Sequence, residues 1–447
     1  MRIMDYDVVI IGAGPAGIFS SIELAAHCSV CIFDTGPDID KRSRNGNILS
    51  GWGGGGAFSD GKLTLSPDVG GQLADMMTKA EITSLLDDVD KMWLDYSGPL
   101  EKFGTDYDKV NQIARSAQKA GLKLVHSEIR HLGTERCPLA LKAMRDYIEG
   151  NADVRMNTSI KSILTKNNSA VGVETESGEI INAKFVIAAP GRVGSGWLCK
   201  EAKRLNIPTI NNAVDIGVRV EIPDEVLNSI TDSIYEPKLV YYSKSFDDKV
   251  RSFCVCPQGE VVTEEHDGVV SVNGHSYAGK KTKNTNFALL VSTVFTEPFN
   301  EPITYGRYVA TLANLLTGNV LVQRLGDLES GRRSTVQRIE RGLVEPTLKS
   351  AVPGDLSFVL PYRYLSSILE MLQAMDNLAP GIADRHTLLY GVEVKYYSSK
   401  LQVSSVCETP VSNLFAIGDG AGITRGLMQS SASGVLAARE IKKRLSS

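Results

Sequence analysis

The stretch "YDVVIIGAGPAGIFSSIELAAHCSVCIFDTG", from Tyr6 to Gly36, decides the fold of this chain. Val8 to Ile11 form a continuous apolar run, which is typical of a parallel strand buried on both faces. Ile18 and Ile22 recur at helical spacing, and a second apolar run follows from Val30 to Phe33. The order strand, helix, strand predicts a βαβ unit.

The first turn of this unit carries a GxGxxG motif at Gly12, Gly14 and Gly17. In such a motif the first glycine makes the tight turn, the second lets the backbone approach a pyrophosphate, and the third lets helix and strand pack closely. The helix N-terminus then faces the phosphates. Asp34 follows the second strand and can accept hydrogen bonds from the adenosine ribose. The predicted dinucleotide contacts are Ile11, Gly12, Gly14, Pro15, Ala16, Gly17, Asp34 and Thr35.

Two later segments favour FAD over NAD. "AKFVIAAPGRVGS" (Ala183–Ser195) is a predicted strand that ends in small residues, and Asn413–Glu440 is a predicted strand, Gly418-Asp419 and a helix. Asp419 can hold a ribityl hydroxyl, which NAD lacks. Backbone N–H groups at the start of the last helix can face the flavin O2/N1 edge and stabilise the anionic reduced flavin. The further predicted FAD contacts are Ile160, Ala189, Gly191, Gly418, Asp419, Gly426, Leu427 and Met428.

A glycine cluster, "GWGGGGAFSDGKL", runs from Gly51 to Leu63. Glycine costs conformational entropy on folding, so a cluster needs a reason. We expect this backbone to lie against the cofactor, while Arg42 and Arg44 just upstream balance the pyrophosphate charge. The alternative is a glycine-rich surface turn with solvated arginines. The predicted cofactor contacts here are Arg42, Arg44, Gly53, Gly54, Gly55, Gly56, Ser59, Asp60 and Lys62.

The cluster resembles the GGxGxFSDGKL signature of bacterial and archaeal FAD-dependent dehydrogenases, a family of NAD(P)/FAD-dependent oxidoreductases. Further segments that resemble this family are "RHLGTERCPLALKAMRDYIE", "SFCVCPQGEVV", "VNGHSYAGKKTKNTNFALLVS", "YGVEVKYYSS" and "GDGAG". The resemblance implies FAD as cofactor and an FAD fold of the glutathione-reductase type. The chain departs from it in "GDGAGITRG" and "EVKYYSS", where the family more often has "GEGAG" and "ETRTSS". A more distant resemblance, to geranylgeranyl reductases, covers only the FAD segments.

The rest of the chain predicts a second domain. Apolar periodicity predicts helices over 72–96 and 107–121, and alternating segments between about 206 and 390 predict an antiparallel sheet with helices beside it. The predicted fold class is α/β, a Rossmann-like FAD-binding domain with a mixed α+β substrate domain built on that sheet. The FAD-binding domain is placed at 1–205 and 395–447, with a helical excursion at about 70–120, and the substrate domain at 206–394. No second GxGxxG occurs in the sequence, which disfavours a built-in NAD(P) domain.

Four residues are predicted to carry chemistry. Glu393 and Lys395 lie two apart in "YGVEVKYY", so they share one face of a strand and could exchange a proton with substrate. His275 is a predicted acid or base, and Lys62 a predicted cation near the isoalloxazine. The alternatives are a surface ion pair for the first two and an ordinary loop histidine for His275.

Composition indicates which partners and which cellular location are expected for the protein. The 447 residues carry a formal net charge of −4, which argues against a nucleic-acid partner. The sequence has no run of about 18 apolar residues, so no membrane span is predicted. Seven cysteines, an odd and scattered set, favour a reducing, cytoplasmic location. Neither the CxxC of Cys28 and Cys31 nor the CxC of Cys254 and Cys256 has a second pair at zinc-ligand spacing; the CxC is predicted to share one strand face.

The sequence therefore predicts an FAD-dependent oxidoreductase, a dehydrogenase or reductase that transfers hydride between flavin and a small organic substrate. Its electron donor or acceptor and its oligomeric state are left open. One alternative is a flavin-dependent C=C reductase of a hydrophobic or isoprenoid-like substrate, which would need a long apolar tunnel. Another is an FAD-bound RNA-modifying or interaction protein, which would need a basic groove.

Overall fold

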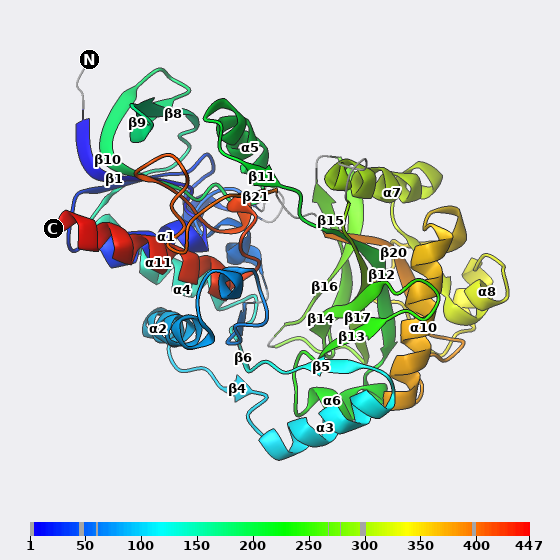
Figure 1. Ribbon diagram of the computed structural model, residues 1–447. Coiled ribbons are helices and arrows are strands. Elements are labelled where there is room, and N and C mark those ends of the chain that lie inside the picture. The colour runs from blue at the N-terminus through cyan, green and yellow to red at the C-terminus, as the bar shows by residue number, and fades with distance from the viewer. Residues whose placement is uncertain are drawn as a thin grey trace. The chain divides into compact units, whose positions relative to one another are not determined.

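The chain folds into two compact units. The computed structural model describes residues 4–43, 49–59, 61–266, 268–277, 279–295, 301–395 and 399–447 (Figure 1). The predicted contacts Arg44 and Asp60 lie outside these residues. Unit 1 comprises Met1–Glu101, Arg130–Asn212 and Tyr397–Ser447, and unit 2 comprises Lys102–Ile129 and Ala213–Tyr396.

Unit 1 is built on a mainly parallel sheet with strand order β7-β2-β1-β10-β9-β8, and β22 pairs with β10. Strands β7, β2, β1, β10 and β22 run parallel to one another. Strand β9 is antiparallel to both of its neighbours, β10 and β8. The bounds are β1 Met4–Ile11, β2 Val30–Phe33, β7 Asp153–Arg155, β8 Ile160–Lys166, β9 Ser169–Thr175, β10 Ile180–Ala188 and β22 Leu414–Ala416. This is the predicted α/β fold, in which the central strands are buried on both faces.

Helices α1 (Pro15–Leu24) and α11 (Leu427–Leu445) pack closely against each other. A Cβ atom on Gly434 would lie 2.2 Å from the Ala16 carbonyl oxygen, so only glycine fits there. The Ser20 hydroxyl donates to the Gly434 carbonyl at 3.1 Å. The first helix of the chain therefore completes its packing against the last.

The remaining elements of unit 1 surround these two helices. The helix predicted over 72–96 begins later, because the Thr78 hydroxyl and the Glu81 carboxylate form a capping box that starts α2. The bounds are α2 Lys79–Ser97, α4 Cys137–Glu149, α5 Ser195–Arg204, β3 Lys62–Thr64, β11 Thr209–Ile210 and β21 Lys400–Leu401, with short 3-10 turns η1 Ile39–Lys41, η2 Gly54–Phe58, η3 Leu73–Asp75 and η6 Asp419–Ala421.

Unit 2 is built on a sheet with strand order β19-β18-β20-β12-β17-β14-β13-β5, in which every pair except β18 with β19 is antiparallel. Strands β15 and β16 form a separate hairpin. The bounds are β5 Lys123–Val125, β12 Val214–Pro223, β13 Lys238–Tyr242, β14 Lys249–Cys256, β15 Glu260–His266, β16 Val269–His275, β17 Asn284–Thr293, β18 Leu321–Arg324, β19 Val352–Pro353 and β20 Leu388–Lys395.

The segment Lys102–Ile129 belongs to unit 2, whereas the sequence placed the excursion at about 70–120 within the first domain. The physical reason is that β5 extends the unit 2 sheet by pairing with β13, and Ala117 and Leu122 are buried in the same core as Leu239. The helices of unit 2 are α3 Tyr107–Lys119, α6 Asn228–Thr231, α7 Pro302–Thr317, α8 Leu325–Glu329, α9 Val336–Glu340 and α10 Tyr362–Leu378. Its short 3-10 turns are η4 Asp224–Val226 and η5 Leu356–Phe358, and the short strand β4 spans Lys102–Phe103.

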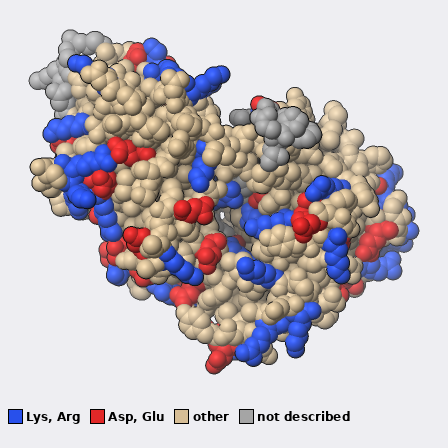
Figure 2. Space-filling view, viewed as in Figure 1, with Lys and Arg blue, Asp and Glu red and all other residues tan. Residues whose placement is uncertain are grey.

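The surface carries charges of both signs. Figure 2 shows lysine and arginine interspersed with aspartate and glutamate over much of the face in view. Within the described ranges, no helix has the length and apolar character needed to cross a bilayer.

Candidate functional site

The glycines of the first turn in unit 1 fall into two kinds. Gly12 has φ +105°, and a Cβ there would lie 2.1 Å from the Ala189 carbonyl oxygen; a Cβ on Gly17 would lie 1.9 Å from the Gly12 carbonyl oxygen. The fold itself requires glycine at both positions. Gly14 has φ −81°, and its Cβ would meet no described atom within 4 Å. Neither strain nor packing requires glycine at 14, but a ligand lying on the backbone would.

Asp34 ties three turns together with its carboxylate. One oxygen accepts a hydrogen bond from the Ala13 N–H at 2.8 Å. The other accepts from the N–H groups of Gly36 and Gly51, each at 2.8 Å. A carboxylate has about four acceptor positions. Three are used by the backbone, so Asp34 first of all holds the glycine turn and the glycine cluster in register, and its predicted ribose contact stays a prediction.

The glycine cluster lies directly on the first turn. The Gly53 N–H donates to the Ala13 carbonyl at 2.7 Å, and a Cβ on Gly54 would come within 3.3 Å of the Gly14 Cα. Trp52, which interrupts the glycines, is fully buried, and its indole N–H donates to the Leu141 carbonyl on α4 at 2.8 Å. The tryptophan anchors the segment, and the glycines let it approach the turn.

The same segment contacts the starts of two helices. A Cβ on Gly56 would lie 3.4 Å from Pro15 Cγ at the start of α1 and 2.9 Å from Leu427 Cδ2 at the start of α11. The N-cap residue of each helix is a glycine, Gly14 for α1 and Gly426 for α11, so neither helix has a capping side chain at its N-cap position. Two uncapped helix ends, each a favourable place for negative charge, therefore lie around one glycine turn.

Arg42 braces the cluster. Its Nη1 donates to the carbonyls of Trp52 at 2.7 Å and Gly54 at 2.6 Å, and its guanidinium lies 4.8 Å from the centre of the Phe58 ring. Burial lowers the pKa of Arg42 to about 10, against the opposing effect of Asp34. The arginine predicted to pair with pyrophosphate thus holds loop carbonyls.

Two further predicted contacts follow the cluster. The Ser59 hydroxyl donates to the Gly56 carbonyl at 3.0 Å and accepts from the Gly61 N–H at 3.2 Å, so it closes its own turn. Lys62, half-buried, begins β3. Ile160 is buried at the start of β8.

Asp419 lies in the second FAD segment, at the start of η6. Its carboxylate accepts from the Thr424 hydroxyl at 2.9 Å and lies 4.0 Å from Arg192 Nε. Burial raises the pKa of Asp419, and Arg192 and Thr424 oppose that rise. A Cβ on Gly420 would lie 2.6 Å from the Gly191 carbonyl oxygen, so this turn packs against the end of the Ala183–Ser195 segment.

Gly191 and Gly426, like Gly14, have no described atom within 4 Å of a Cβ built on them. Gly191 has φ +63° and Gly426 has φ +84°, and Gly426 is the N-cap residue of α11. Open space at three glycines, two uncapped helix ends and a cluster that contacts both helices fit a dinucleotide with its pyrophosphate on backbone amides. The residues of unit 1 could hold FAD.

Sequence reasoning missed two residues beside this space. Arg192 Nη2 lies 3.4 Å from a Cβ built on Gly55, which places a cation between the glycine cluster and Asp419. Gln429 donates from Nε2 to the Val69 carbonyl at 2.9 Å, while its Oε1 is buried and has no donor among the described residues. A role for Arg192 could have been predicted from the sequence, because it directly follows Gly191. The sequence gave no such indication for Gln429.

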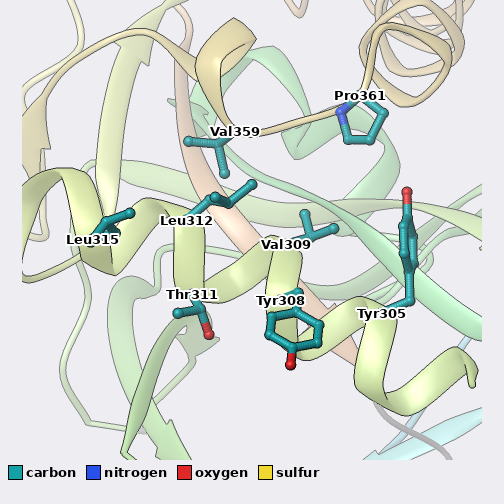
Figure 3. A pocket seen from close by; sticks show the side chains of 8 residues that line it. All are labelled: Tyr305, Tyr308, Val309, Thr311, Leu312, Leu315, Val359 and Pro361. Carbon is teal, nitrogen blue, oxygen red and sulfur yellow. The ribbon is translucent and has the colours of Figure 1, made fainter.

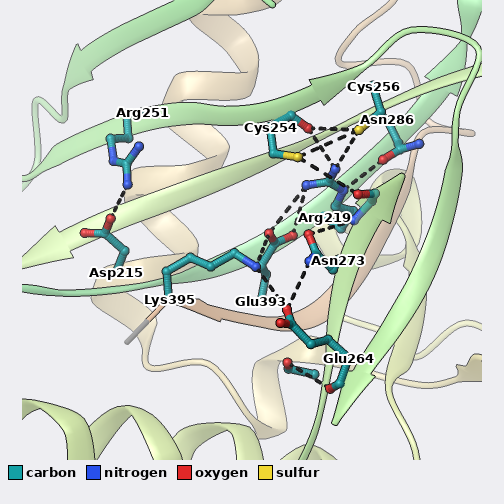
Figure 4. A network of polar contacts seen from close by, with 12 residues as sticks. Asp215, Arg219, Arg251, Cys254, Cys256, Glu264, Asn273, Asn286, Glu393 and Lys395 are labelled. Atoms are coloured by element: carbon teal, nitrogen blue, oxygen red, sulfur yellow. Dashed lines mark hydrogen bonds and ion pairs between the residues drawn. The ribbon is translucent and has the colours of Figure 1, made fainter. Parts of the chain in front are cut away.

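Glu393 and Lys395 share a face of β20, but that face is buried in unit 2 (Figure 4). Glu393 lies 3.4 Å from Arg219 Nη1 and 3.2 Å from Lys395 Nζ, and Lys395 also lies 3.6 Å from Glu264. Burial opposes the charged form of Lys395, but Glu393 and Glu264 outweigh burial and raise its pKa. These residues form a cluster of two cations and two anions, which we call the charge cluster (Arg219, Glu264, Glu393 and Lys395). Arg219 and Glu393 are fully buried, whereas Glu264 and Lys395 are partly exposed.

His275 ends β16 and is half-buried, with its ring centre 6.4 Å from that of Tyr277. Its predicted acid–base role stays a prediction. In the part of the chain that the structure describes, no three metal-ligating side chains gather in one place.

A pocket of about 480 Å³ lies on α7 of unit 2, near Val359 and Pro361 (Figure 3). Its other lining residues are Tyr305, Tyr308, Val309, Thr311, Leu312 and Leu315. Tyr308 is 69% exposed and Leu315 78% exposed, so the pocket is an apolar groove on an outer helix. It does not supply the long tunnel that a C=C reductase of this kind would need.

Comparison with known proteins finds a family match in one of the two units. Residues 213–396 match the family "FAD-dependent protein, C-terminal domain-like". A protein of Clostridium beijerinckii, described as "Uncharacterized protein", is 27% identical, and the match covers 97% of this chain and 80% of that protein.

The solved structures are more distant. L-proline dehydrogenase from P. horikoshii has 13% identity and a TM-score of 0.46, covering 99% of this chain and 95% of that one. Glycine oxidase from Geobacillus kaustophilus has 13% identity and a TM-score of 0.39, covering 98% and 95%. Likenesses at these TM-scores add nothing to the assignment.

The family match and the architecture of unit 1 point to the same cofactor. The architecture of unit 1 confirms the predicted fold class, and the family matched by residues 213–396 is one of FAD-dependent proteins, in agreement with the predicted cofactor. Flavin supplies the redox chemistry, and the protein supplies binding, orientation and electrostatics.

Proposed function

We propose that unit 1 binds FAD along its glycine turn and that the enzyme transfers hydride between flavin and a small organic substrate. The observation that carries this proposal is the open space at Gly14, which neither φ nor packing explains. The flavin would supply the hydride chemistry. The chain's own residues hold the cofactor and exclude water from it.

The pyrophosphate would lie on the N–H groups of the first turn and the start of α1, with Arg192 and Arg42 supplying positive charge nearby. Asp34 positions the turn, and Thr35, the next residue, would contact the ribose. Asp419 would hold the ribityl chain, and the N–H groups at the start of α11 would face the flavin. The remaining proposed contacts are Ile11, Gly12, Pro15, Ala16, Gly17, Gly53, Gly54, Gly55, Gly56, Ser59, Lys62, Ile160, Ala189, Gly191, Gly418, Gly426, Leu427 and Met428.

We further propose that the chain belongs with the FAD-dependent dehydrogenases that carry the GGxGxFSDGKL signature, with an FAD fold of the glutathione-reductase type. Unit 1 would be the FAD-binding domain and unit 2 the substrate domain. For acid–base catalysis we place His275 and Lys62 ahead of Glu393 and Lys395, because Glu393 is fully buried and pairs with both Arg219 and Lys395. The cytoplasmic location stays a prediction.

The experiment is cofactor release followed by a reduction assay. The purified protein should be yellow and should release FAD, not FMN, when it is denatured. Colourless protein that cannot be reconstituted with FAD would contradict the proposal.

Stopped-flow reduction against a panel of small metabolites then tests the direction of the reaction. Reduction of the flavin by one of them supports a dehydrogenase. Oxidation of the pre-reduced flavin by an isoprenoid-like alkene, with no metabolite reducing it, would instead favour the C=C reductase.

A further inference from the structure

Two cysteines lie next to the charge cluster, on strand β14. Cys254 and Cys256 have their sulfur atoms 3.8 Å apart, and all seven cysteines of the chain are present as thiols (Figure 4). A β-bulge brings them together: Phe253 pairs with Ala288 and Cys256 with Asn286, so β14 has one residue more than β17 between these pairs. Cys254 takes the left-handed φ of +46° that the bulge requires.

Arg219 fixes this bulge from β12, which is separated from β14 by β17. Its Nη2 donates to the Cys254 carbonyl at 2.8 Å and lies 3.4 Å from Cys256 Sγ. Its Nε donates to Asn286 Oδ1 at 2.8 Å. A Cβ on Gly274 would come within 1.8 Å of Arg219 Nη2, so glycine at 274 makes room for the guanidinium. The guanidinium in contact with Cys256 Sγ favours the thiolate of that residue, which is the reactive form of cysteine.

The two cysteine residues differ in exposure. Cys254 is half-buried, whereas Cys256 is fully buried. A reagent from solution can therefore reach Cys254 first, and Cys256 Sγ lies 3.8 Å from Cys254 Sγ. This is the arrangement of an attacking thiol and a resolving thiol.

We propose that Cys254 and Cys256 form a reversible redox-active dithiol that reacts with low-molecular-weight disulfides. The Cys254 thiolate attacks the S–S bond of the small disulfide, which breaks; a mixed disulfide forms and one small thiolate leaves. The Cys256 thiolate then attacks Cys254 Sγ, and the second small thiolate leaves as the intramolecular S–S bond forms. The two thiol protons go to the two released thiolates, so the protein dithiol loses two electrons and two protons and one disulfide becomes two thiols.

Differential alkylation of the native full-length protein tests this proposal. The protein is equilibrated in buffers of glutathione and glutathione disulfide, quenched with acid, unfolded, alkylated, digested with trypsin and analysed by mass spectrometry. The tryptic peptide 252–280 contains Cys254 and Cys256 and no other cysteine. We expect it to lose two hydrogen atoms and both alkylation sites as the disulfide fraction rises, and to regain them when glutathione is restored.

The chain offers a matched control in peptide 3–41, which contains only the CxxC cysteines, Cys28 and Cys31. Burial raises the pKa of Cys28 to about 11 and that of Cys31 to about 12, so both stay protonated and slow to react. This peptide should keep both alkylation sites in every buffer. The proposal is overturned if peptide 252–280 stays fully alkylated, or if it oxidises to the same extent in urea-denatured protein, because the fold then contributes nothing.

Two variants test the order of the steps. Cys256→Ser should accumulate a stable glutathione adduct on Cys254, because no resolving thiol remains. Cys254→Ser should acquire a glutathione adduct on Cys256 at least ~10-fold more slowly, because that sulfur is buried. Equal rates of adduct formation in the two variants would overturn the assignment of Cys254 as the attacking thiol.

Discussion

The glycine turn of unit 1 and the charge cluster of unit 2 satisfy their polar groups in opposite ways. In unit 1, Asp34 and Arg42 bind loop amides and carbonyls, and open space remains over Gly14. In unit 2, the charged side chains of Arg219 and Lys395 both pair with the carboxylate of Glu393. The comparison shows that a ligand site is better recognised by space that the fold leaves unfilled than by charged residues. Charge alone does not distinguish a catalytic group from a buried structural ion pair.

The largest expected effect breaks the charge cluster. Glu393→Gln leaves Arg219 and Lys395 buried with one anion between them, and we expect the free energy of unfolding to fall by about 3 kcal/mol in urea titration. The lower end of the range for a broken buried pair applies because the contacts to Arg219 are long, at 3.4 Å. Glu345→Gln, which removes one partner of an exposed ion pair on the same unit, is the control and should change nothing. Unchanged stability with slowed turnover would make Glu393 a catalytic group.

The next prediction tests whether the Asp34 carboxylate stabilises the loops around it or serves only to bind the ribose. Asp34→Ala removes the acceptor of three backbone N–H groups, so FAD-stripped protein should lose about 2 kcal/mol of unfolding free energy. The control is Asp40→Ala, because Asp40 lies exposed on the same segment and pairs only with exposed Lys142 among the described residues. If the stripped Asp34→Ala protein unfolds like the parent and only its FAD affinity falls, the carboxylate serves the ribose.

A third substitution fills the open space at the glycine turn. Gly14→Ala adds one methyl group where the fold has room, so stability should hold while FAD binding weakens by about 1–2 kcal/mol, or roughly 5- to 30-fold in Kd. Gly196→Ala is the matched control in the same unit, since its Cβ also meets no described atom within 4 Å. Isothermal titration of stripped protein with FAD measures both. Equal affinities for the two variants would remove Gly14 from the cofactor site.

The smallest effect concerns Asp419 and pH. Burial raises its pKa in the folded state, so ionisation of this carboxyl costs stability as pH rises above the ordinary aspartate value of about 3.9. Asp419→Asn should therefore melt like the parent below that pH and at a slightly higher temperature near neutrality, while binding FAD more weakly. A variant that is less stable than the parent at neutral pH would show that Arg192 pairs with Asp419 more strongly than burial opposes its charge.

Local patterns predicted the βαβ unit, because strand and helix periodicity and the fold-required glycines at 12 and 17 are all carried within thirty residues. The pairing of Glu393 with Lys395 is equally local, since period two places both on one face. What sequence could not show is that the face is buried, because Arg219 reaches Glu393 from a strand 174 residues away.

Two other features were not predicted by hydrophobic periodicity. The helix predicted from position 72 begins at Lys79, where the Thr78 and Glu81 side chains cap it. The bulge at Cys254 was hidden as well, because the CxC spacing reads as a regular strand until the register with β17 is known. Periodicity predicts an element, but side-chain capping and strand register decide its ends and irregularities.

The packing of α1 against α11 has a consequence for how the protein is made. Ser20 and Gly434, which touch across the two helices, are 414 residues apart. At ribosomal rates of about 5–20 residues per second, α1 must wait roughly 20–80 s for its partner to be synthesised. During that time the face of α1 that Gly434 packs against stays uncovered, so this part of the unit 1 core can close only after the last helix has been synthesised.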